Sequence, residues 1–497
     1  MTDVLGRRRA GVLLHPTSLP GSGPNGTLGN DALRFVDWLV GGGFTVWQTL
    51  PLGPADAYGS PYRLQSTYAG DPRLIDPRRL AELDELPKRM AHDAVHGAPL
   101  DAYRSFCACA SPEQQRRFAR FMRRDRKRLL PYGLFELCKH RFGGAPWWEW
   151  PPAFRRRPSA ELLRLLAAER ERFRATAFRQ YLFELSWSAV KRYANARGVY
   201  LFGDLPFYVD HNSVEVWWEP HLFQLDADGR PFAIAGVPPD YFNENGQLWG
   251  NPLYDWRAHE RSGFDWWMRR LERALERFDL LRIDHFRALE SYWEVPASAA
   301  SAREGRWREA PGAALLETVR ARFGSMPLVA EDLGLITDEV RALRDRFELP
   351  GMVVLQFAFD GLPDNPHVPE HHRRNEVVYT GTHDNDTVVG WYASLDDATR
   401  ARVDAALGSS PPDLPAALIE KAYASPAQLA IVPMQDLMGL GSEARMNRPG
   451  TAEGNWGWRF DWRDLDPRIT VEARRRAERY ERAVPPSEGG AAPTSSA

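Results

Sequence analysis

Eight short apolar runs recur along this chain, and the segments between them show helical periodicity, which together limit the folds it can adopt. Strands that alternate with helices usually pair in parallel. Nearly continuous apolar strands are typical of a sheet that is covered on both faces. We therefore predict an α/β fold, a (β/α)8 TIM barrel, with strands in residues 11–16, 45–53, 199–206, 279–286, 326–334, 351–359, 375–385 and 429–437.

Two connections between the predicted strands are too long to be simple crossovers. Residues 57–195, after the second strand, carry helical and arginine-rich patterns, so we expect a largely helical insertion there. Residues 207–262, after the third strand, are aromatic and loop-like, so we expect an aromatic, loop-rich insertion. The low-complexity segment 485–497 predicts a disordered tail, which leaves residues 1–484 as a single barrel domain.

The composition excludes several classes of protein. A net charge of −2 over 497 residues gives no strong field toward nucleic acid or anionic lipid, and the basic run 114–130 has the pattern of a solvated helix face. No run approaches the roughly 20 apolar residues of a membrane span, and the N-terminal apolar run is too short for a secretory signal. We therefore expect a cytoplasmic protein without nucleic-acid or membrane partners, and its oligomeric state stays open.

The three cysteines, Cys107, Cys109 and Cys138, have neither the spacing of a metal site nor that of a disulfide framework. We therefore expect no metal in this protein. Its 18 tryptophans exceed ordinary core needs, and stacking surfaces for a flat ligand are one use for the surplus.

Acidic residues follow three of the predicted strands, at the end where a barrel of this kind carries its chemistry. The fourth strand ends in Asp284, the fifth in Glu331 and Asp332, and the seventh in Asp384 and Asp386. We expect these side chains to converge at one rim. Two carboxylates about 5 Å apart can act as nucleophile and acid/base in retaining sugar hydrolysis or transfer. Ion pairs that only stabilise strand ends would give a similar pattern.

The neighbours of these acids suggest a role for each. Arg282 precedes Asp284 by two residues on the same strand face, and a nearby guanidinium keeps a carboxylate ionised, as a nucleophile requires. Glu331 follows an apolar stretch, a setting that raises the pKa of a carboxyl toward that of a proton donor. Asp384, beside His383, would stabilise positive charge on the sugar ring and hold its hydroxyls.

An ordered series of motifs runs through more than 400 residues of the chain. The motifs are HPTSLPG (15–21), YGSPY (58–62), GDLPFYV (203–209), GVPPDYF (236–242), GQLWGNPLYDW (246–256), LRIDHFRA (281–288), AEDLG (330–334), LQFAFD (355–360), YTGTHDNDT (379–387), QDLMGLGSEARMNRPGT (435–451) and GNWGWR (454–459). As a set they resemble the amylomaltases, the 4-α-glucanotransferases of glycoside hydrolase family 77, which are relatives of the α-amylases.

The resemblance implies roles for individual residues. Asp284 would be the nucleophile, Glu331 the acid/base and Asp384 the transition-state stabiliser, while Arg282 and His383 would hold the nucleophile and the sugar hydroxyls. The aromatic loop 236–256 looks like the one that covers the donor chain in this family, and its expected stacking faces are Tyr241, Phe242 and Trp249. Further sugar contacts are expected at Tyr58, Ser60, Asp204, Gln247, Asp360, Asn455 and Trp456.

The resemblance also implies the reaction. It is the retaining transfer of α-1,4-glucan segments, from a maltooligosaccharide or starch-like glucan to the 4-hydroxyl of an acceptor glucan or glucose, through a covalent glucosyl-enzyme. No cofactor and no C-terminal β-sandwich domain are expected. Hydrolysis or debranching by the same residues, and glucan binding without catalysis, stay open as alternatives. The segments NEN (243–245) and YAGD (68–71) depart from the family pattern, and the first leaves the donor-loop contacts and the product size open.

Overall fold

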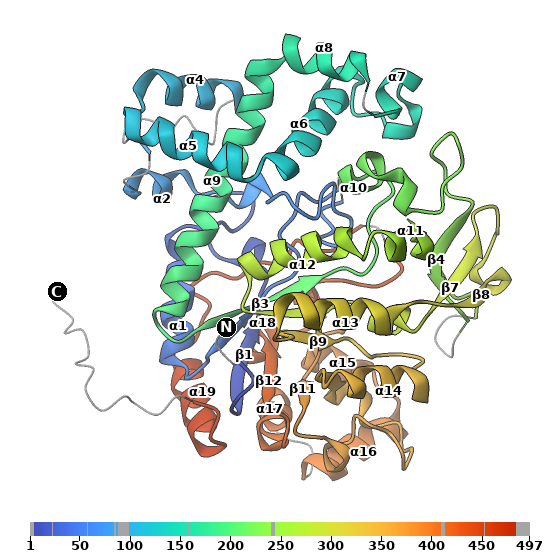
Figure 1. Cartoon of the computed structure of the whole chain (residues 1–497). Coiled ribbons are helices and arrows are strands. Elements are labelled where there is room, and N and C mark those ends of the chain that lie inside the picture. Colours follow the sequence, from blue (N-terminus) through green and yellow to red (C-terminus); the bar gives the residue numbers. More distant parts are fainter. Residues whose placement is uncertain are drawn as a thin grey trace.

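Eight parallel strands form the centre of the computed structural model (Figure 1). The structure describes residues 4–21, 23–56, 58–83, 86–87, 99–157, 159–239, 244–408, 413–451 and 453–483. The strands are β1 (Arg9–Leu13), β2 (Val46–Gln48), β3 (Tyr200–Leu205), β6 (Leu280–Ile283), β9 (Leu328–Ala330), β10 (Gly351–Val354), β11 (Glu376–Tyr379) and β12 (Leu429–Pro433). Neighbouring strands pair in the order β10–β11–β12–β1–β2–β3–β6–β9.

The two ends of this sheet, β9 and β10, meet and close it into a barrel. The backbone N–H of Ala330 donates to the carbonyl of Pro350 at 2.8 Å, and the carboxylate of Asp332 accepts from the N–H of Met352, also at 2.8 Å. Each of the eight predicted runs overlaps one of the observed strands. The prediction of a (β/α)8 barrel is therefore confirmed.

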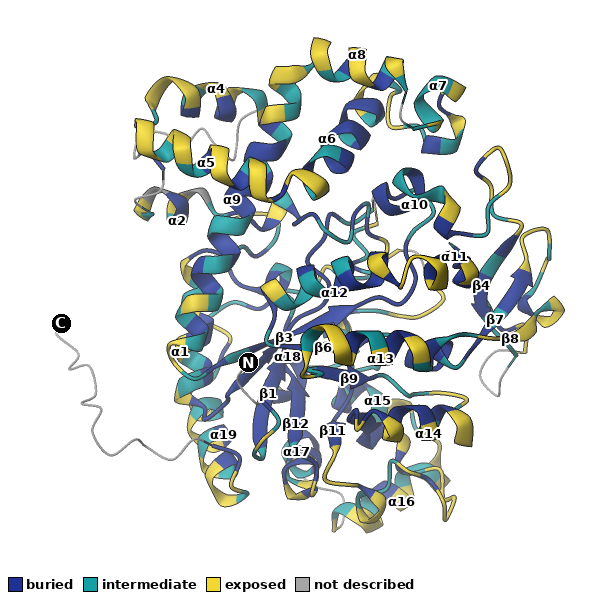
Figure 2. Cartoon of the chain, in the orientation of Figure 1, coloured by how far each residue is buried: buried dark blue, intermediate teal, exposed yellow. Residues whose placement is uncertain are grey.

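The strands are buried on both faces, as the dark blue sheet in Figure 2 shows. One hydrophobic cluster takes alternate strand residues, among them Leu280 of β6, and so fills the barrel interior. The strands approach one another closely at Gly11. A Cβ atom there would lie 2.6 Å from Cδ1 of Ile431 and 2.8 Å from Cβ of Val46, which are its partners on the two flanking strands. Only glycine allows this register.

Helices surround the barrel (Figure 1). They are α1 (Asn30–Gly41), α9 (Arg170–Asn195), α12 (Asp265–Arg277), α13 (Gly312–Phe323), α14 (Asp338–Arg346), α15 (Val388–Ser394), α16 (Asp397–Leu407), α17 (Leu414–Ala424), α18 (Met434–Leu437) and α19 (Pro467–Arg479). The connection between β10 and β11, all of which is described, holds only the 3-10 helices Leu355–Phe357 and Pro369–His371. In that segment the regular alternation of strand and helix is broken.

The connection from β2 to β3 forms a helical layer, at the top of Figure 1. Its helices before α9 are α2 (Pro77–Glu82), α4 (Pro99–Cys109), α5 (Pro112–Arg124), α6 (Arg126–Arg141), α7 (Pro152–Arg155) and α8 (Ala160–Ala168). The run 114–130, which has the pattern of one helix, is divided between α5 and α6. The division lies at Asp125, whose buried carboxylate accepts hydrogen bonds from Arg124 and Arg128.

The connection from β3 to β6 contains more regular structure than the expected loops. It holds α10 (Val214–Trp218), β4 (Ala233–Val237), β5 (Gln247–Pro252) and α11 (Trp256–Arg261). The two strands join β7 (Ser291–Pro296) and β8 (Arg306–Glu309) in an antiparallel sheet of order β5–β4–β7–β8. Short strands with Gly and Pro carry little periodicity, and half of this sheet comes from residues beyond the insertion, so the sequence pattern did not reveal it.

Three further observations bear on the expectations from sequence. The predicted disordered tail, residues 485–497, lies outside the described residues. In the part of the chain that the structure describes, no helix has the length and apolar character to cross a membrane. In the same part, no group of three or more His, Cys, Asp or Glu side chains is arranged to hold a metal ion.

Candidate active site

The predicted acids lie at the carboxyl end of the barrel. Asp284 directly follows β6 and Glu331 directly follows β9, and these two strands are neighbours. The strand pairing continues to both acids, because the N–H of Asp284 donates to the carbonyl of Leu205 and the N–H of Glu331 to that of Ile283, each at 3.1 Å. Asp384 lies in the loop after β11. The barrel frame therefore sets the backbone positions of Asp284 and Glu331.

Arg282 connects three carboxylates inside the barrel mouth. Its Nη1 donates to both oxygens of Asp204, at 2.9 and 2.8 Å. Its Nη2 lies 2.9 Å from Oδ1 of Asp284 and 4.0 Å from Oε2 of Glu331. Although burial opposes it, the charges of Asp204 and Asp284 raise the pKa of Arg282 well above its usual range. Arg282 therefore stays protonated, and its charge lies in direct contact with Asp204 and Asp284.

The carboxyl group of Glu331 is held by two backbone groups. Oε2 accepts from the N–H of His285 at 2.6 Å and Oε1 accepts from the N–H of Leu333 at 3.2 Å. Burial raises its pKa to about 7; the charge of Arg282 opposes this rise and that of Asp284 adds to it. A carboxyl group with such a pKa can hold a proton near neutral pH and release it during a reaction.

Asp384 is positioned by a loop that follows β12. Nδ2 of Asn447 donates to its Oδ1 at 2.6 Å, and Nη2 of Arg445 donates to its backbone carbonyl at 2.6 Å. Nε2 of His383 lies 3.4 Å from the same Oδ1. The Asp384 side chain is 47% exposed, so a substrate can reach it. Arg445 and Asn447 were not among the predicted site residues, although both lie in a motif that carried the resemblance.

A third residue missed from the sequence is Tyr62, the last residue of the YGSPY motif. Its hydroxyl donates to Oδ2 of Asp204 at 2.7 Å. Its ring stacks on that of His383, with centroids 5.0 Å and planes 16° apart, and Trp456 lies 6.0 Å from both rings. Tyr62, His383 and Trp456 thus form an aromatic wall beside the acids. The signal in the sequence that could have identified Tyr62 is the second tyrosine of the YGSPY motif.

The aromatic loop contributes Trp249, on β5. Its ring lies edge-on to the ring of His285, with centroids 4.7 Å apart and planes at 76°. Its indole N–H donates to Oε1 of Gln247 at 3.1 Å, so these two predicted contacts lie together next to the acids. Tyr241 and Phe242, the other predicted stacking faces of this loop, lie outside the described residues.

Several predicted sugar contacts are engaged elsewhere. The Asp204 side chain has no exposed surface and is bound by Arg282, so it supports the site from below and cannot touch a sugar in this arrangement. Oδ1 of Asp360 accepts from the N–H of Leu362 at 2.9 Å within an exposed turn. Asp332, expected at the rim, turns away from it and pairs with Arg344 at 2.5 Å.

Three of the remaining candidates lie at one cavity. Tyr58, Asn455 and Trp456 line this cavity, which is open to solvent, and Tyr58 is 55% exposed. The Asn455 amide already bonds within its own loop, to the N–H of Arg448 and to the carbonyl of Thr451. Oγ of Ser60 accepts from the N–H of Tyr62 at 3.3 Å and thereby shapes the YGSPY turn.

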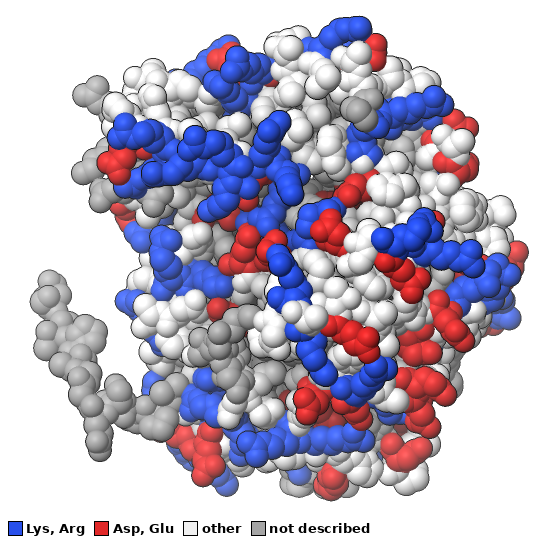
Figure 3. Space-filling model, viewed as in Figure 1, with Lys and Arg blue, Asp and Glu red and all other residues white. Residues whose placement is uncertain are grey.

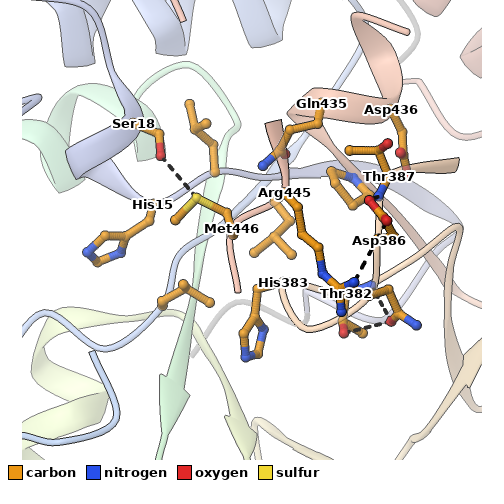
Figure 4. A pocket seen from close by; sticks show the side chains of 15 residues that line it. His15, Ser18, Thr382, His383, Asp386, Thr387, Gln435, Asp436, Arg445 and Met446 are labelled. Atoms are coloured by element: carbon orange, nitrogen blue, oxygen red, sulfur yellow. Dashed lines mark hydrogen bonds and ion pairs between the residues drawn. The ribbon is translucent and has the colours of Figure 1, made fainter. Parts of the chain in front are cut away.

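A second cavity is lined by His383 together with His15, Asp386 and Arg445 (Figure 4). Figure 4 shows Arg445 reaching Asp386 and the rings of His15 and His383 at the same side of the pocket; His15 also borders the first cavity. Burial lowers the pKa of His15 to about 3, so this ring is neutral. The acids, the aromatic wall and both cavities thus share one rim of the barrel.

A family model described as 4-alpha-glucanotransferase matches residues 14–465, which is most of the chain. The chain belongs to the 4-alpha-glucanotransferase family. The 4-alpha-glucanotransferase of Thermus thermophilus is 47% identical over 96% of this chain and 99% of that protein. The chloroplastic/amyloplastic 4-alpha-glucanotransferase of Arabidopsis thaliana is 41% identical over 92% of this chain and 82% of its own length.

A solved structure agrees with this assignment to the 4-alpha-glucanotransferase family. The amylomaltase from Streptococcus agalactiae, determined in complex with acarbose, superposes with a TM-score of 0.91 at 34% sequence identity. The match covers 96% of this chain and all of the solved one. The resemblance inferred from the sequence motifs is therefore confirmed over nearly the whole chain.

Proposed function

We propose that this chain is a retaining 4-α-glucanotransferase that moves α-1,4-glucan segments from a donor maltooligosaccharide or starch-like glucan to the 4-hydroxyl of an acceptor glucan or glucose. The observation that carries the proposal is the position of Arg282, whose Nη2 lies 2.9 Å from Asp284 and 4.0 Å from Glu331. Both carboxylates thus lie within 4.0 Å of one nitrogen, and a retaining reaction needs two neighbouring carboxylates. Membership of the 4-alpha-glucanotransferase family supports the same activity.

In the first step Glu331 acts as an acid and Asp284 as a nucleophile. The protonated carboxyl of Glu331 donates its proton to the glycosidic oxygen, and the bond from that oxygen to C1 of the donor breaks. An oxygen of Asp284 forms the new bond to C1, which gives a covalent glucosyl-enzyme. The raised pKa of Glu331 lets its carboxyl hold the proton near neutral pH, and the guanidinium of Arg282 lies 2.9 Å from Asp284.

In the second step Glu331 acts as a base. Its carboxylate takes the proton of the acceptor 4-hydroxyl, whose oxygen attacks C1 and displaces Asp284. The two inversions at C1 retain the configuration, and Glu331 regains the proton for the next cycle. Asp384 faces the positive charge that develops on the ring in both steps. The aromatic wall of Tyr62, His383 and Trp456 provides the flat surface beside it.

Incubation with maltotriose tests the proposal. A transferase releases glucose and builds a ladder of longer maltooligosaccharides, with few new reducing ends. Hydrolysis and binding without catalysis, the alternatives that the sequence left open, are not favoured by the relatives. Glucose and maltose without longer products, or no products at all, would contradict the proposal. The expected location in the cytoplasm stays a prediction.

A further inference from the structure

His285 lies between the two reacting acids and the aromatic loop. It directly follows Asp284 in the chain, and its backbone N–H donates to Oε2 of Glu331 at 2.6 Å. Its ring packs edge-on against the indole of Trp249, with centroids 4.7 Å apart. One residue thus contacts the acid/base through its backbone and β5 of the aromatic loop through its side chain.

The backbone of His285 adopts the left-handed conformation, with φ 49° and ψ 49°. For a residue other than glycine this conformation is strained, and such strain persists only where the surroundings hold it. The N–H of His285 reaches the side chain of Glu331, while the next N–H, of Phe286, donates to the backbone carbonyl of Glu331 at 3.0 Å. Two consecutive donors therefore hold both the main chain and the carboxyl group of Glu331.

Trp249 was expected from the sequence as a stacking face for the donor chain, and its contact with His285 connects it to Glu331, next to the leaving and entering sugars. Glu331 acts on the oxygen between the transferred segment and the sugar that departs first, which is the position that the acceptor later fills. The surface next to its carboxyl therefore borders the acceptor. Trp249 is partly exposed there, and its bond to Gln247 orients the indole from within the loop. The ring of Tyr208, 6.2 Å from Trp249 and 6.3 Å from His285, packs against both.

We propose that His285 is a positioning residue that couples acceptor binding at Trp249 to the placement of the Glu331 carboxylate. The proposal rests on the transferase function proposed above. A sugar stacked on Trp249 keeps the indole against the His285 ring, and the strained backbone of His285 carries that contact to the N–H on Oε2. Burial lowers the pKa of His285 to about 4, so its neutral ring acts through packing and not through charge.

The coupling can be measured with α-maltosyl fluoride as donor, since fluoride departs without a proton and its release reports every turnover. Hydrolysis is followed without acceptor, and transfer is followed with labelled glucose. His285→Gly keeps the N–H and suits the left-handed backbone but lacks the ring. We expect the KM for glucose to rise roughly threefold to tenfold, the size of one aromatic edge contact, and hydrolysis to fall by a smaller factor than transfer.

Two further variants complete the experiment. His285→Phe restores an aromatic edge and should recover most of the affinity for glucose, whereas His285→Asn, which tolerates the left-handed backbone, should resemble His285→Gly. Glu348→Gly is the matched control, because Glu348 is an exposed left-handed residue in the turn before β10, and it should change neither activity.

Equal losses of hydrolysis and transfer in His285→Gly and His285→Asn would overturn the coupling, because they would show a purely structural role. An unchanged KM for glucose in both variants would also overturn it. Failure of the transferase function itself would look different: the unmodified protein would then release fluoride without forming any labelled maltotriose from glucose.

Discussion

At the scale of single residues, we propose different tasks for Asp284 and Glu331, as nucleophile and as acid/base. Glu331→Gln should separate their tasks with α-glucosyl fluoride as donor. This donor needs no proton to depart, so the variant should form the glucosyl-enzyme and accumulate it, because the base for the second step is missing. Mass spectrometry of the quenched variant should place a glucosyl group on a peptide that contains Asp284.

Adding Asp284→Asn to this variant provides its control, since the double variant should carry no adduct. Asp284→Asn alone should lose both transfer and hydrolysis while keeping the fold, because the amide has nearly the same shape. An adduct on Asp384, or near-normal activity of Asp284→Asn, would contradict the roles proposed for the acids.

The pKa of Glu331 predicts the pH dependence. Burial and the charge of Asp284 raise it to about 7 against the opposing charge of Arg282. The free enzyme needs Glu331 protonated for the first step, so kcat/KM for maltotriose should fall about tenfold per pH unit above roughly pH 7. With α-glucosyl fluoride, the rate of glucosyl-enzyme formation should not fall above pH 7. If the rate falls with this donor too, the pH dependence belongs to a group other than Glu331.

The sequence predicted the acids because they follow apolar strands, where the alternation of side chains and the barrel rim determine their direction. It did not predict that Asp204 is buried against Arg282. Asp204 also lies on a strand, and the sequence alone does not distinguish an aspartate that pairs with a buried arginine from one that contacts a sugar. Tyr62 and Asn447 reach the site from loops far away in the sequence. Their contacts depend on how those loops fold over the rim, which no local pattern records.

At the scale of elements, β5 and its Trp249 should control the balance between transfer and hydrolysis. Trp249→Ala removes a stacking surface on the acceptor side and admits water, so transfer should fall roughly threefold to tenfold more than hydrolysis. Trp307→Ala on β8 is a suitable control, because this exposed tryptophan belongs to the same antiparallel sheet but contacts Trp293 and Arg287. Labelled glucose and reducing-end assays on maltotriose measure both activities. Equal losses would contradict this role for the loop.

Elements with strong periodicity were predicted and those with weak periodicity were not. The eight barrel strands are nearly continuous apolar runs, so their positions could be read directly. The break between α5 and α6 lies at Asp125, whose buried carboxylate accepts hydrogen bonds from the side chains of Arg124 and Arg128. A helical pattern alone does not show these contacts. The sheet that contains β4 and β5 is completed by β7, which pairs with β4, and by β8, and both of these strands follow more than 30 residues after β5.

At the scale of the whole molecule, a buried ion cluster connects α9, the last helix of the helical layer, to α12, which packs on the barrel. Glu184 of α9 pairs with Arg273 and, at 2.7 Å, with Arg277, both on α12. Although burial opposes it, the two charges lower the pKa of Glu184 to about 2. A pKa below the unfolded value of about 4.3 stabilises the fold above that pH, and this contribution is lost as the pH falls toward 2.

Glu184→Gln should therefore lower the free energy of unfolding at pH 7 by about 3 kcal/mol, because it leaves two buried arginines without their acid. Urea unfolding at pH 7 and pH 3 measures the effect, which should shrink at the lower pH. Glu171→Gln on the same helix removes an exposed pair with Arg104 and should change stability little. An equal effect of Glu184→Gln at both pH values would contradict the assigned charge interaction.

Figure 3 shows that positive and negative side chains alternate over much of the viewed face, with arginines and lysines gathered over α5 and the start of α6. Exposed members of this group include Arg116, Arg120, Arg123 and Lys127. The net charge of −2 means that acidic side chains elsewhere balance them. The molecule therefore has a local basic area without the overall field that would draw it to polyanions.

The closure of the barrel between β9 and β10 has a consequence for heat inactivation. The hydrogen bonds Ala330–Pro350 and Asp332–Met352 connect β9 to β10 on either side of Glu331, and we call this contact the seam. A brief local opening of the seam would displace Glu331 while the rest of the barrel stays folded. Activity should then disappear, reversibly on cooling, several degrees below the temperature at which circular dichroism records melting. Asp332→Asn should widen this interval, because it weakens the seam. The highest temperature at which the enzyme is active would thus be set by local opening between β9 and β10 and not by global unfolding of the protein.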